Sequence, residues 1–404
     1  MLSPNRNDGM KTRTSIIAAV TLFVLLLPLI LGSTLYRRNQ RQQALPAACA
    51  KAFRDKNWKN LEASAREWTR LQSTPGGQYW LGISQKEQGN FDAAFQAFET
   101  IPLDGIRGID AAIERMELLF HYFQLPLPAI QLADQLLKLD PKLAAPRRNL
   151  IYFHAMMLHR AELLRQIHLA IEDHSDLPEH YAYLLTMEDL GFRDAEVVTQ
   201  KWSEATPTSE VLKNTYLARQ IRTARTAVLS SSTPELAARY AALQAEILPQ
   251  LNQLDSEPIA LDTQLLLAMD SGNTEQAGQL LSQVPDSSAN DPGFWRYRGW
   301  YAMRIGDLEQ ADEAYRQALE LHPLGWQTRT EYASVLRLRG RSTEAAAAQS
   351  VAAQGADLVA EIRRLPHAQK IPFELLKRIA TYAAACDSLP VANGILRRQQ
   401  KSVK

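Results

Sequence analysis

The sequence predicts an all-α protein in which one N-terminal transmembrane helix precedes a solenoid of stacked helix pairs. Three observations predict this fold: an uncharged apolar stretch at 14–36, small residues that recur every 34 positions near the C-terminus, and apolar residues at helical spacing almost throughout. The composition agrees, since 46% hydrophobic and 22% charged residues over 404 positions are typical of a folded chain.

Residues 14–36 form the predicted membrane span, because roughly 20 apolar helical residues cross a hydrocarbon layer about 30 Å thick. Basic residues flank this stretch on both sides: Lys11, Arg13, Arg37, Arg38 and Arg41. The alternative is a cleaved signal peptide, whose apolar core usually has about 7–15 residues. A short basic N-terminus usually stays in the cytoplasm, so we expect an extracytoplasmic domain, although the basic residues after the span favour the opposite orientation.

The C-terminal half contains an internal repeat of 34 residues. Gly272, Gly306 and Gly340 share this spacing, and so do Ala277, Ala311 and Ala345. Because several residue types keep one period, we predict consecutive units of the same supersecondary structure.

The clearest repeat runs from 292 to 325. Asp291 and Pro292 are typical of a helix start, and Gly306 is typical of a helix end. Asp307 can cap the next helix, and Gln310 can reach back to it three residues later. The repeat is therefore predicted to be a helix, a tight turn and a second helix.

These residues resemble the signature of the tetratricopeptide repeat, and the positions that carry the resemblance are Trp295, Gly299, Gly306, Ala311, Tyr315, Ala318 and Pro323. The chain departs from the signature at Ala302, where an aromatic residue is usual. The resemblance implies a right-handed α-solenoid. At Gly299 and Ala311 it implies two helices that cross with room for only a hydrogen atom or a methyl group.

Weaker copies of the repeat extend the array in both directions, and the 34-residue phase is lost only in the middle of the chain. The chain therefore divides into a basic tail (1–13), the span (14–36), a juxtamembrane segment (37–57), N-terminal repeats (58–204), divergent helices or a joint (205–257), C-terminal repeats (258–360) and a helical cap with a basic tail (361–404).

No residue pattern in the sequence indicates catalysis or a cofactor. Phosphate-binding glycine loops, zinc-protease motifs, serine-hydrolase elbows and paired cysteines are all missing. Five histidines lie between His154 and His180, but their spacings of 5, 9, 6 and 6 differ from the three or four expected of ligands on one helix face. Cys386 lies in an apolar stretch typical of a buried thiol. We therefore predict no metal, no cofactor and no small-molecule substrate.

The resemblance implies a concave face, lined by the first helix of each repeat, that binds peptides or partner proteins. Transferring the family's groove positions selects eight residues: Arg296, Trp300, Met303, Arg304, Gln327, Thr330, Ser334 and Arg337. Arginines beside an aromatic ring suit an extended segment that bears carboxylates. A face that is simply solvated is the alternative.

The sequence thus favours a membrane-anchored scaffold that binds partner proteins and assembles a complex. A net charge of +1 gives no overall attraction to nucleic acid. Two alternatives remain: an accessory or catalytic subunit of a membrane-associated enzyme with its site in 205–257, and a solenoid that associates with itself. The basic tail, with Arg397 and Arg398, is expected to be a solvated end.

Overall fold

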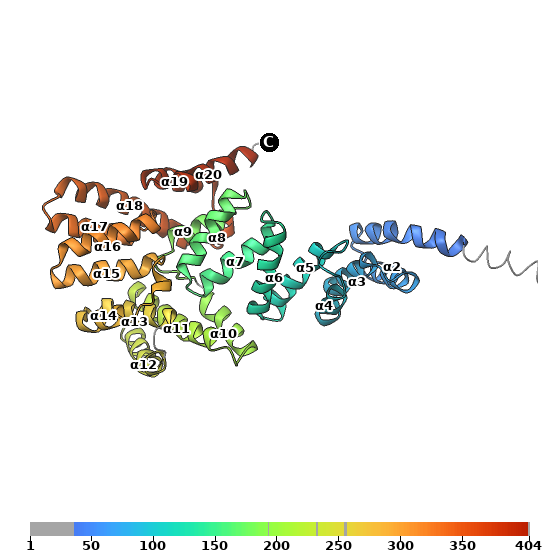
Figure 1. The fold of residues 1–404 in the computed structure, drawn as a ribbon, viewed down its shortest axis with the longest axis horizontal. Helices are drawn as coiled ribbons and strands as arrows, with labels where there is room; N and C mark the ends of the chain where they lie inside the picture. The colour runs from blue at the N-terminus through green and yellow to red at the C-terminus, as the bar shows by residue number, and fades with distance from the viewer. Residues whose placement is uncertain (1–35, 193, 232, 254–256, 403–404) are drawn as a thin grey trace, which may run out of the picture. The chain divides into compact units, whose positions relative to one another are not determined.

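Every regular element in the described part of the chain is a helix (Figure 1). The computed structural model describes residues 36–402 except 193, 232 and 254–256. The chain divides into two compact units after Leu118. The division falls inside the segment 58–204, where a single array of repeats was predicted.

The first unit consists of helix pairs that pack on one another. After a helix over residues 36–54, its elements are α2 (Trp58–Leu71), α3 (Pro75–Glu87), α4 (Phe91–Glu99) and α5 (Gly108–Glu117). A Cβ atom on Gly82 would lie 2.5 Å from the ring of Phe98, so α3 and α4 can cross as closely as they do only with glycine at that position.

The second unit begins with a π-helical turn (η1, Leu118–Tyr122) that straddles the division. Its first helices are α6 (Pro126–Leu139), α7 (Ala144–Met156), α8 (Arg160–Glu172), α9 (Pro178–Leu185) and α10 (Ala195–Ala205). Next come two long helices, α11 (Glu210–Ser230) and α12 (Pro234–Leu251), in the region where the repeat phase is lost. Their apolar cluster includes Ile221, Ile247 and Leu251.

The C-terminal repeats follow as three helix pairs. Their helices are α13 (Pro258–Ser271), α14 (Thr274–Leu281), α15 (Pro292–Ile305), α16 (Leu308–Leu321), α17 (Trp326–Leu338) and α18 (Ser342–Arg364), with a short 3-10 turn (η2, Asp286–Ser288) before α15. Gly272, Gly306 and Gly340 have φ values of 69°, 86° and 74°, which confirms the left-handed turn predicted after each first helix.

The predicted close crossing in the best repeat is confirmed. A Cβ atom on Gly299 would lie 2.9 Å from the ring of Tyr315, and Ala311 is fully buried in the cluster beside that ring. The Asp307 carboxylate accepts from the backbone N–H of Gln310 at 3.0 Å, which is the predicted cap of α16. Sequence reasoning therefore placed the helix ends and the contact in this repeat.

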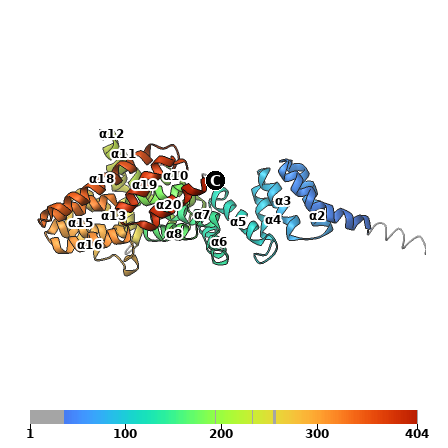
Figure 2. The ribbon, with the colours of Figure 1, turned by 90° about the horizontal axis from the view of Figure 1, so that it is seen from above.

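The last helices return to the beginning of the second unit. A short turn (η3, Ala368–Lys370) leads to α19 (Phe373–Ala385) and α20 (Leu389–Ser402), and α20 packs against α8 (Figures 1 and 2). Arg397 donates to Asp176 at 3.0 Å and to the carbonyl of Ile171 at 2.8 Å, and Arg398 also contacts Asp176. The expectation of a solvated basic end was therefore wrong for these two arginines.

The membrane localisation predicted from the sequence requires correction. Among the described residues, no helix combines the length and the apolar content that a bilayer crossing requires. The predicted span at 14–36 lies outside the described residues except for Tyr36, which is helical and exposed, as are Arg37 and Arg38 after it. The single-pass membrane localisation predicted from the sequence is therefore wrong for the part of the chain that the structure describes.

Candidate partner-binding site

The eight predicted partner-binding residues lie on α15 and α17, which are in contact. Arg296 and Glu331 join the two helices through a two-pronged ion pair, with Nη2 2.6 Å and Nε 3.1 Å from Glu331 Oε1. Arg296 Nη1 also donates to Gln327 Oε1 at 3.0 Å. The pair is largely shielded from solvent, so the donors of Arg296 are engaged within the protein.

Trp300 and Met303 form part of the apolar core between α13 and α15. Trp300 is buried in a cluster that includes Leu265 and Phe294, and Met303 packs against the edge of that cluster. Arg304 is exposed, and its guanidinium carbon lies 5.8 Å from the centre of the Trp300 ring. The indole therefore supports an exposed cation and offers little surface of its own.

The remaining predicted residues follow α17 toward its C-terminal end. The hydroxyl groups of Thr330 and Ser334 donate to backbone carbonyls one turn earlier, at 2.9 and 3.5 Å. Arg337 is exposed and donates to Ser334 Oγ at 3.0 Å. The C-terminal halves of α15 and α17 therefore present two exposed cations, Arg304 and Arg337.

The N-terminal end of α17 is occupied by another part of the chain, residues 186–190, which we call the acidic turn. The Glu188 carboxylate accepts from the backbone N–H groups of Gln327 at 2.8 Å and Thr328 at 2.7 Å, and also from the Thr328 hydroxyl. The residue before α17 is Gly325, which has no side chain to cap the helix. Glu188 thus supplies the missing cap from a residue 139 positions earlier than Gln327.

Asp189 of the acidic turn is held by this end of α17 and by Arg363 in the last turn of α18. Its carboxylate accepts from Gln327 Nε2 at 3.1 Å and from Arg363 Nη2 at 2.6 Å. Burial alone would raise the pKa of Asp189, but the guanidinium groups of Arg363 and Arg296 hold it below its usual value. Burial raises the pKa of Glu188. The face that was predicted to bind carboxylates therefore already holds two carboxylates of this chain.

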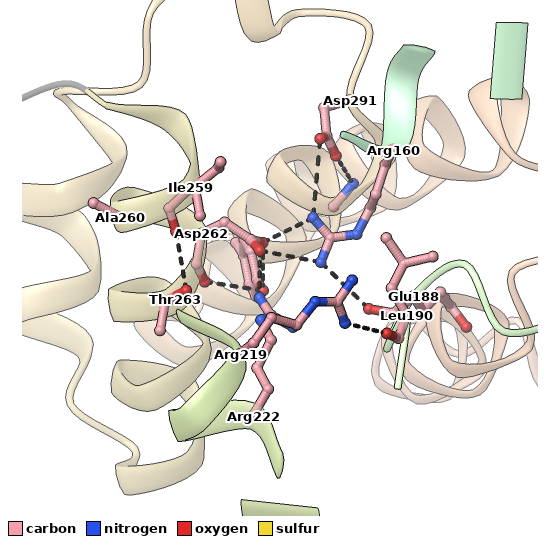
Figure 3. A network of polar contacts seen from close by, with 12 residues as sticks. Arg160, Glu188, Leu190, Arg219, Arg222, Ile259, Ala260, Asp262, Thr263 and Asp291 are labelled. Carbon is pink, nitrogen blue, oxygen red and sulfur yellow. Dashed lines mark hydrogen bonds and ion pairs between the residues drawn. The ribbon is translucent and has the colours of Figure 1, made fainter. Parts of the chain in front are cut away.

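A buried network of charges lies beside the acidic turn (Figure 3). Arg160 of α8 donates to both carboxylate oxygens of Asp262 of α13, at 2.9 and 3.2 Å. Arg222 of α11 also pairs with Asp262, and the hydroxyl of Tyr297 donates to it at 3.0 Å. Burial would raise the pKa of Asp262, but the two guanidinium groups hold it below its usual value. One carboxylate thus joins helices from four helix pairs.

The same network holds the backbone of the acidic turn. Arg160 Nη2 donates to the carbonyl of Glu188 at 3.4 Å, and Arg219 donates to the carbonyl of Leu190 (Figure 3). Arg219 also donates to the carbonyls of Ala155 and Met156 at the end of α7. Burial lowers the pKa of Arg219 to about 9. The acidic turn is therefore held on two sides: arginines bind its backbone carbonyls, and α17 binds its carboxylates.

A cavity of about 10 Å³ lies between α8, α15 and the acidic turn, and its lining includes Arg160, Glu188, Arg296 and His322. A single water molecule needs about 10–15 Å³, so this space is too small for an organic substrate. None of its lining residues comes from 205–257, the region considered for an enzyme site.

The histidine cluster contains one contact that spacing arguments did not predict. The Nδ1 atoms of His154 and His159 lie 3.4 Å apart, because the chain reverses at Leu158 between α7 and α8, where φ is 62°. Burial, followed by the neighbouring His159, lowers the pKa of His154 to about 3. Within the described ranges, no three or more His, Cys, Asp or Glu side chains are arranged to hold a metal ion. Cys386 is buried, and burial raises the pKa of its thiol.

Comparison with known proteins identifies the same repeat in both units. Two family descriptions, both named Tetratricopeptide repeat, match residues 292–324 and 77–102. No curated protein matches the chain.

Three solved structures are among those to which the chain is similar. The crystal structure of the APC/C hetero-tetramer Cut9-Hcn1 is 12% identical, with 89% of this chain and 72% of that chain covered and a TM-score of 0.30. Yeast Tom70 is 12% identical, with 90% and 97% covered and a TM-score of 0.27. The structure of Naa15/Naa10 bound to HypK-THB is 13% identical, with 93% and 66% covered and a TM-score of 0.27.

The repeated helix pairs suit protein binding, because stacked repeats create extended concave surfaces. The chain carries tetratricopeptide repeats within an all-α, solenoid-like fold.

Proposed function

We propose that this protein is a non-catalytic scaffold that binds an acidic segment of a partner protein along α15 and α17 and so assembles a complex. The observation that carries the proposal is the pairing of Asp189 with Gln327 and Arg363, since one end of this face already binds carboxylates. The other end presents Arg304 and Arg337 to solvent.

The two ends differ in what they offer to a partner. At the N-terminal end, Arg296 and Gln327 contact Glu331 and the acidic turn, so a partner meets few free donors there. At the C-terminal end, Arg304 stacks over Trp300, and Arg337 donates to the hydroxyl of Ser334. A partner carboxylate therefore binds first at Arg304 and Arg337, where desolvation costs least.

The proposal can be tested with two blocked hexapeptides labelled with a fluorophore. One carries Glu at both ends, and the other carries Gln at the same positions. Fluorescence anisotropy at low ionic strength compares their affinities for the protein, because exposed charge pairs are screened over about 10 Å at 0.1 M salt. We expect the Glu peptide to bind at least about three-fold more tightly, since each exposed pair contributes about 0.2–1 kcal/mol.

Two double substitutions, each removing two arginines, test where the peptide binds. Arg304→Ala with Arg337→Ala should abolish the preference for the Glu peptide. The control is Arg298→Ala with Arg316→Ala, which removes the same charge from α15 and α16; Arg298 stacks on Trp295, and Arg316 pairs with Asp312. If the control pair loses the preference equally, or if the intact protein shows no preference, the proposed site is wrong.

A further inference from the structure

The acidic turn lies where a partner's carboxylate would bind. Its Asp189 side chain is 26% exposed and its partner Arg363 is 49% exposed, so the pair stands at the rim of the face and is not part of the core. Gln327, which was selected as a groove residue from sequence, donates its side-chain amide to the same carboxylate. A partner that reaches this end therefore meets donors that are already engaged.

The backbone of the turn is fixed independently of Asp189. Met187 and Leu190 on either side of the acidic pair are 0% exposed, and Arg160 and Arg219 hold the carbonyls of Glu188 and Leu190. Removing the Asp189 side chain would therefore leave the turn in place and free Gln327 and Arg363.

The length of α17 sets the size of the segment that fits. Its 13 residues span about 20 Å at about 1.5 Å per residue. An extended peptide rises about 3.3 Å per residue, so about six residues reach from Arg363 and Gln327 at one end to Arg337 at the other. A segment with a carboxylate at each end matches both groups of donors.

From these observations we infer that Asp189 is a built-in competitor that occupies the second carboxylate subsite of the partner-binding face, formed by Gln327 and Arg363. This inference rests on the proposed function, and it specifies the partner as an extended segment of about six residues with an acidic side chain at each end. Binding in the protein as it stands uses the Arg304 and Arg337 end alone.

The test measures the affinity of the Glu and Gln hexapeptides for Asp189→Ala. We expect the Glu peptide to bind about five-fold more tightly than it binds the intact protein, with no change for the Gln peptide, because one further charge pair forms. Adding Arg363→Ala to Asp189→Ala should cancel the gain. Asp194→Ala is the matched control, since Asp194 is an exposed acidic residue of the same connection, and it should leave both affinities unchanged.

The outcomes separate this inference from the proposed function. If the intact protein prefers the Glu peptide but Asp189→Ala binds it no more tightly, the site at Arg304 and Arg337 is supported and the competing role of Asp189 is wrong. If only Asp189→Ala prefers the Glu peptide, the competing role of Asp189 is supported and the site at Arg304 and Arg337 is wrong. An equal gain in Asp194→Ala would show a general charge effect and overturn the competitor. If Asp189→Ala fails to fold, Asp189→Asn replaces it, with a smaller gain of the same sign expected and no gain overturning the inference.

Discussion

The carboxylate of Glu188 caps the first turn of α17 by accepting the backbone N–H of Thr328 at 2.7 Å, although the two residues are 140 positions apart. Helix caps usually come from the residue just before the helix, and here that residue is Gly325. The acidic turn is therefore part of the structure of the C-terminal repeats as well as part of their proposed binding face.

Glu188→Ala should lower the free energy of unfolding by about 1–3 kcal/mol. The change leaves the N–H groups of Gln327 and Thr328 without their acceptor at a partly buried helix end. Urea unfolding measures the loss. Glu204→Ala, at an exposed position of α10, should change stability by less than about 0.5 kcal/mol. Equal effects in the two variants would mean that Glu188 caps nothing.

Asp262→Ala should destabilise the second unit by about 3–5 kcal/mol. It leaves Arg222 buried without its carboxylate and leaves Arg160 with only the carboxylate of Asp291, 3.9 Å away, and an uncompensated buried charge costs far more than the pair itself contributes. The measurement is the midpoint of chemical unfolding. Asp270→Ala is the control, because Asp270 pairs with the more exposed Arg225. A loss no larger than that of the control would contradict the role given to Asp262.

Gly299→Ala should cost about 1–3 kcal/mol of stability through overpacking. The new methyl group would lie 2.9 Å from the ring of Tyr315, and the buried ring has little room to move. Ala311→Leu, on the other helix of the same crossing, should have an effect of the same sign. Thermal unfolding checks both variants. An unchanged melting temperature in both would show that the two helices separate more easily than the structure indicates.

Buried histidines should make the protein less stable at acidic pH. His322 is an example, because burial lowers its pKa to about 3. An unfolded histidine titrates near 6.5, so between about 6.5 and 3 the unfolded state binds more protons and stability falls as the pH falls. The slope reaches about 1.4 kcal/mol per pH unit for each such histidine. His322→Gln should reduce this slope in unfolding experiments between pH 7.5 and 5.

His367→Gln, at an exposed position, controls for the loss of an imidazole. If His322→Gln and His367→Gln show the same dependence on pH as the intact protein, protonation of His322 does not oppose folding.

Asp176→Asn should loosen the C-terminal helix without unfolding the repeats. Asp176 is the carboxylate shared by Arg397 and Arg398, and it is nearly inaccessible to solvent. Hydrogen exchange should show faster exchange in α20, with α15 and α16 unchanged. Uniform acceleration in all three helices would mean that this contact supports the whole second unit.

Local chemistry made much of the repeat architecture predictable. The turns at Gly306 and Gly340 follow from the conformational freedom of glycine, and the crossing of Gly299 with Tyr315 follows from a fixed spacing within one repeat. Such features depend on residues within a few turns of each other.

The division at Leu118 and the contact between His154 and His159 could not be predicted in this way. The first depends on which helices pack together, and the second depends on a chain reversal at Leu158 that repeat spacing does not reveal. The engagement of Arg296 with Glu331 was also missed, because a groove position transferred from a family says nothing about its neighbours in this chain.

Hydrophobic period, caps and glycine turns act over short distances along the chain, so they predict the helical fold and the pairing of the C-terminal helices into repeats. The contacts of Asp189 with Arg363 and of Arg397 with Asp176 arise only when the second unit folds. These contacts join residues more than a hundred positions apart, so their existence depends on how many helix pairs stack before the chain meets itself. Each helix pair is rotated slightly relative to the one before it, and no local sequence pattern encodes the total rotation.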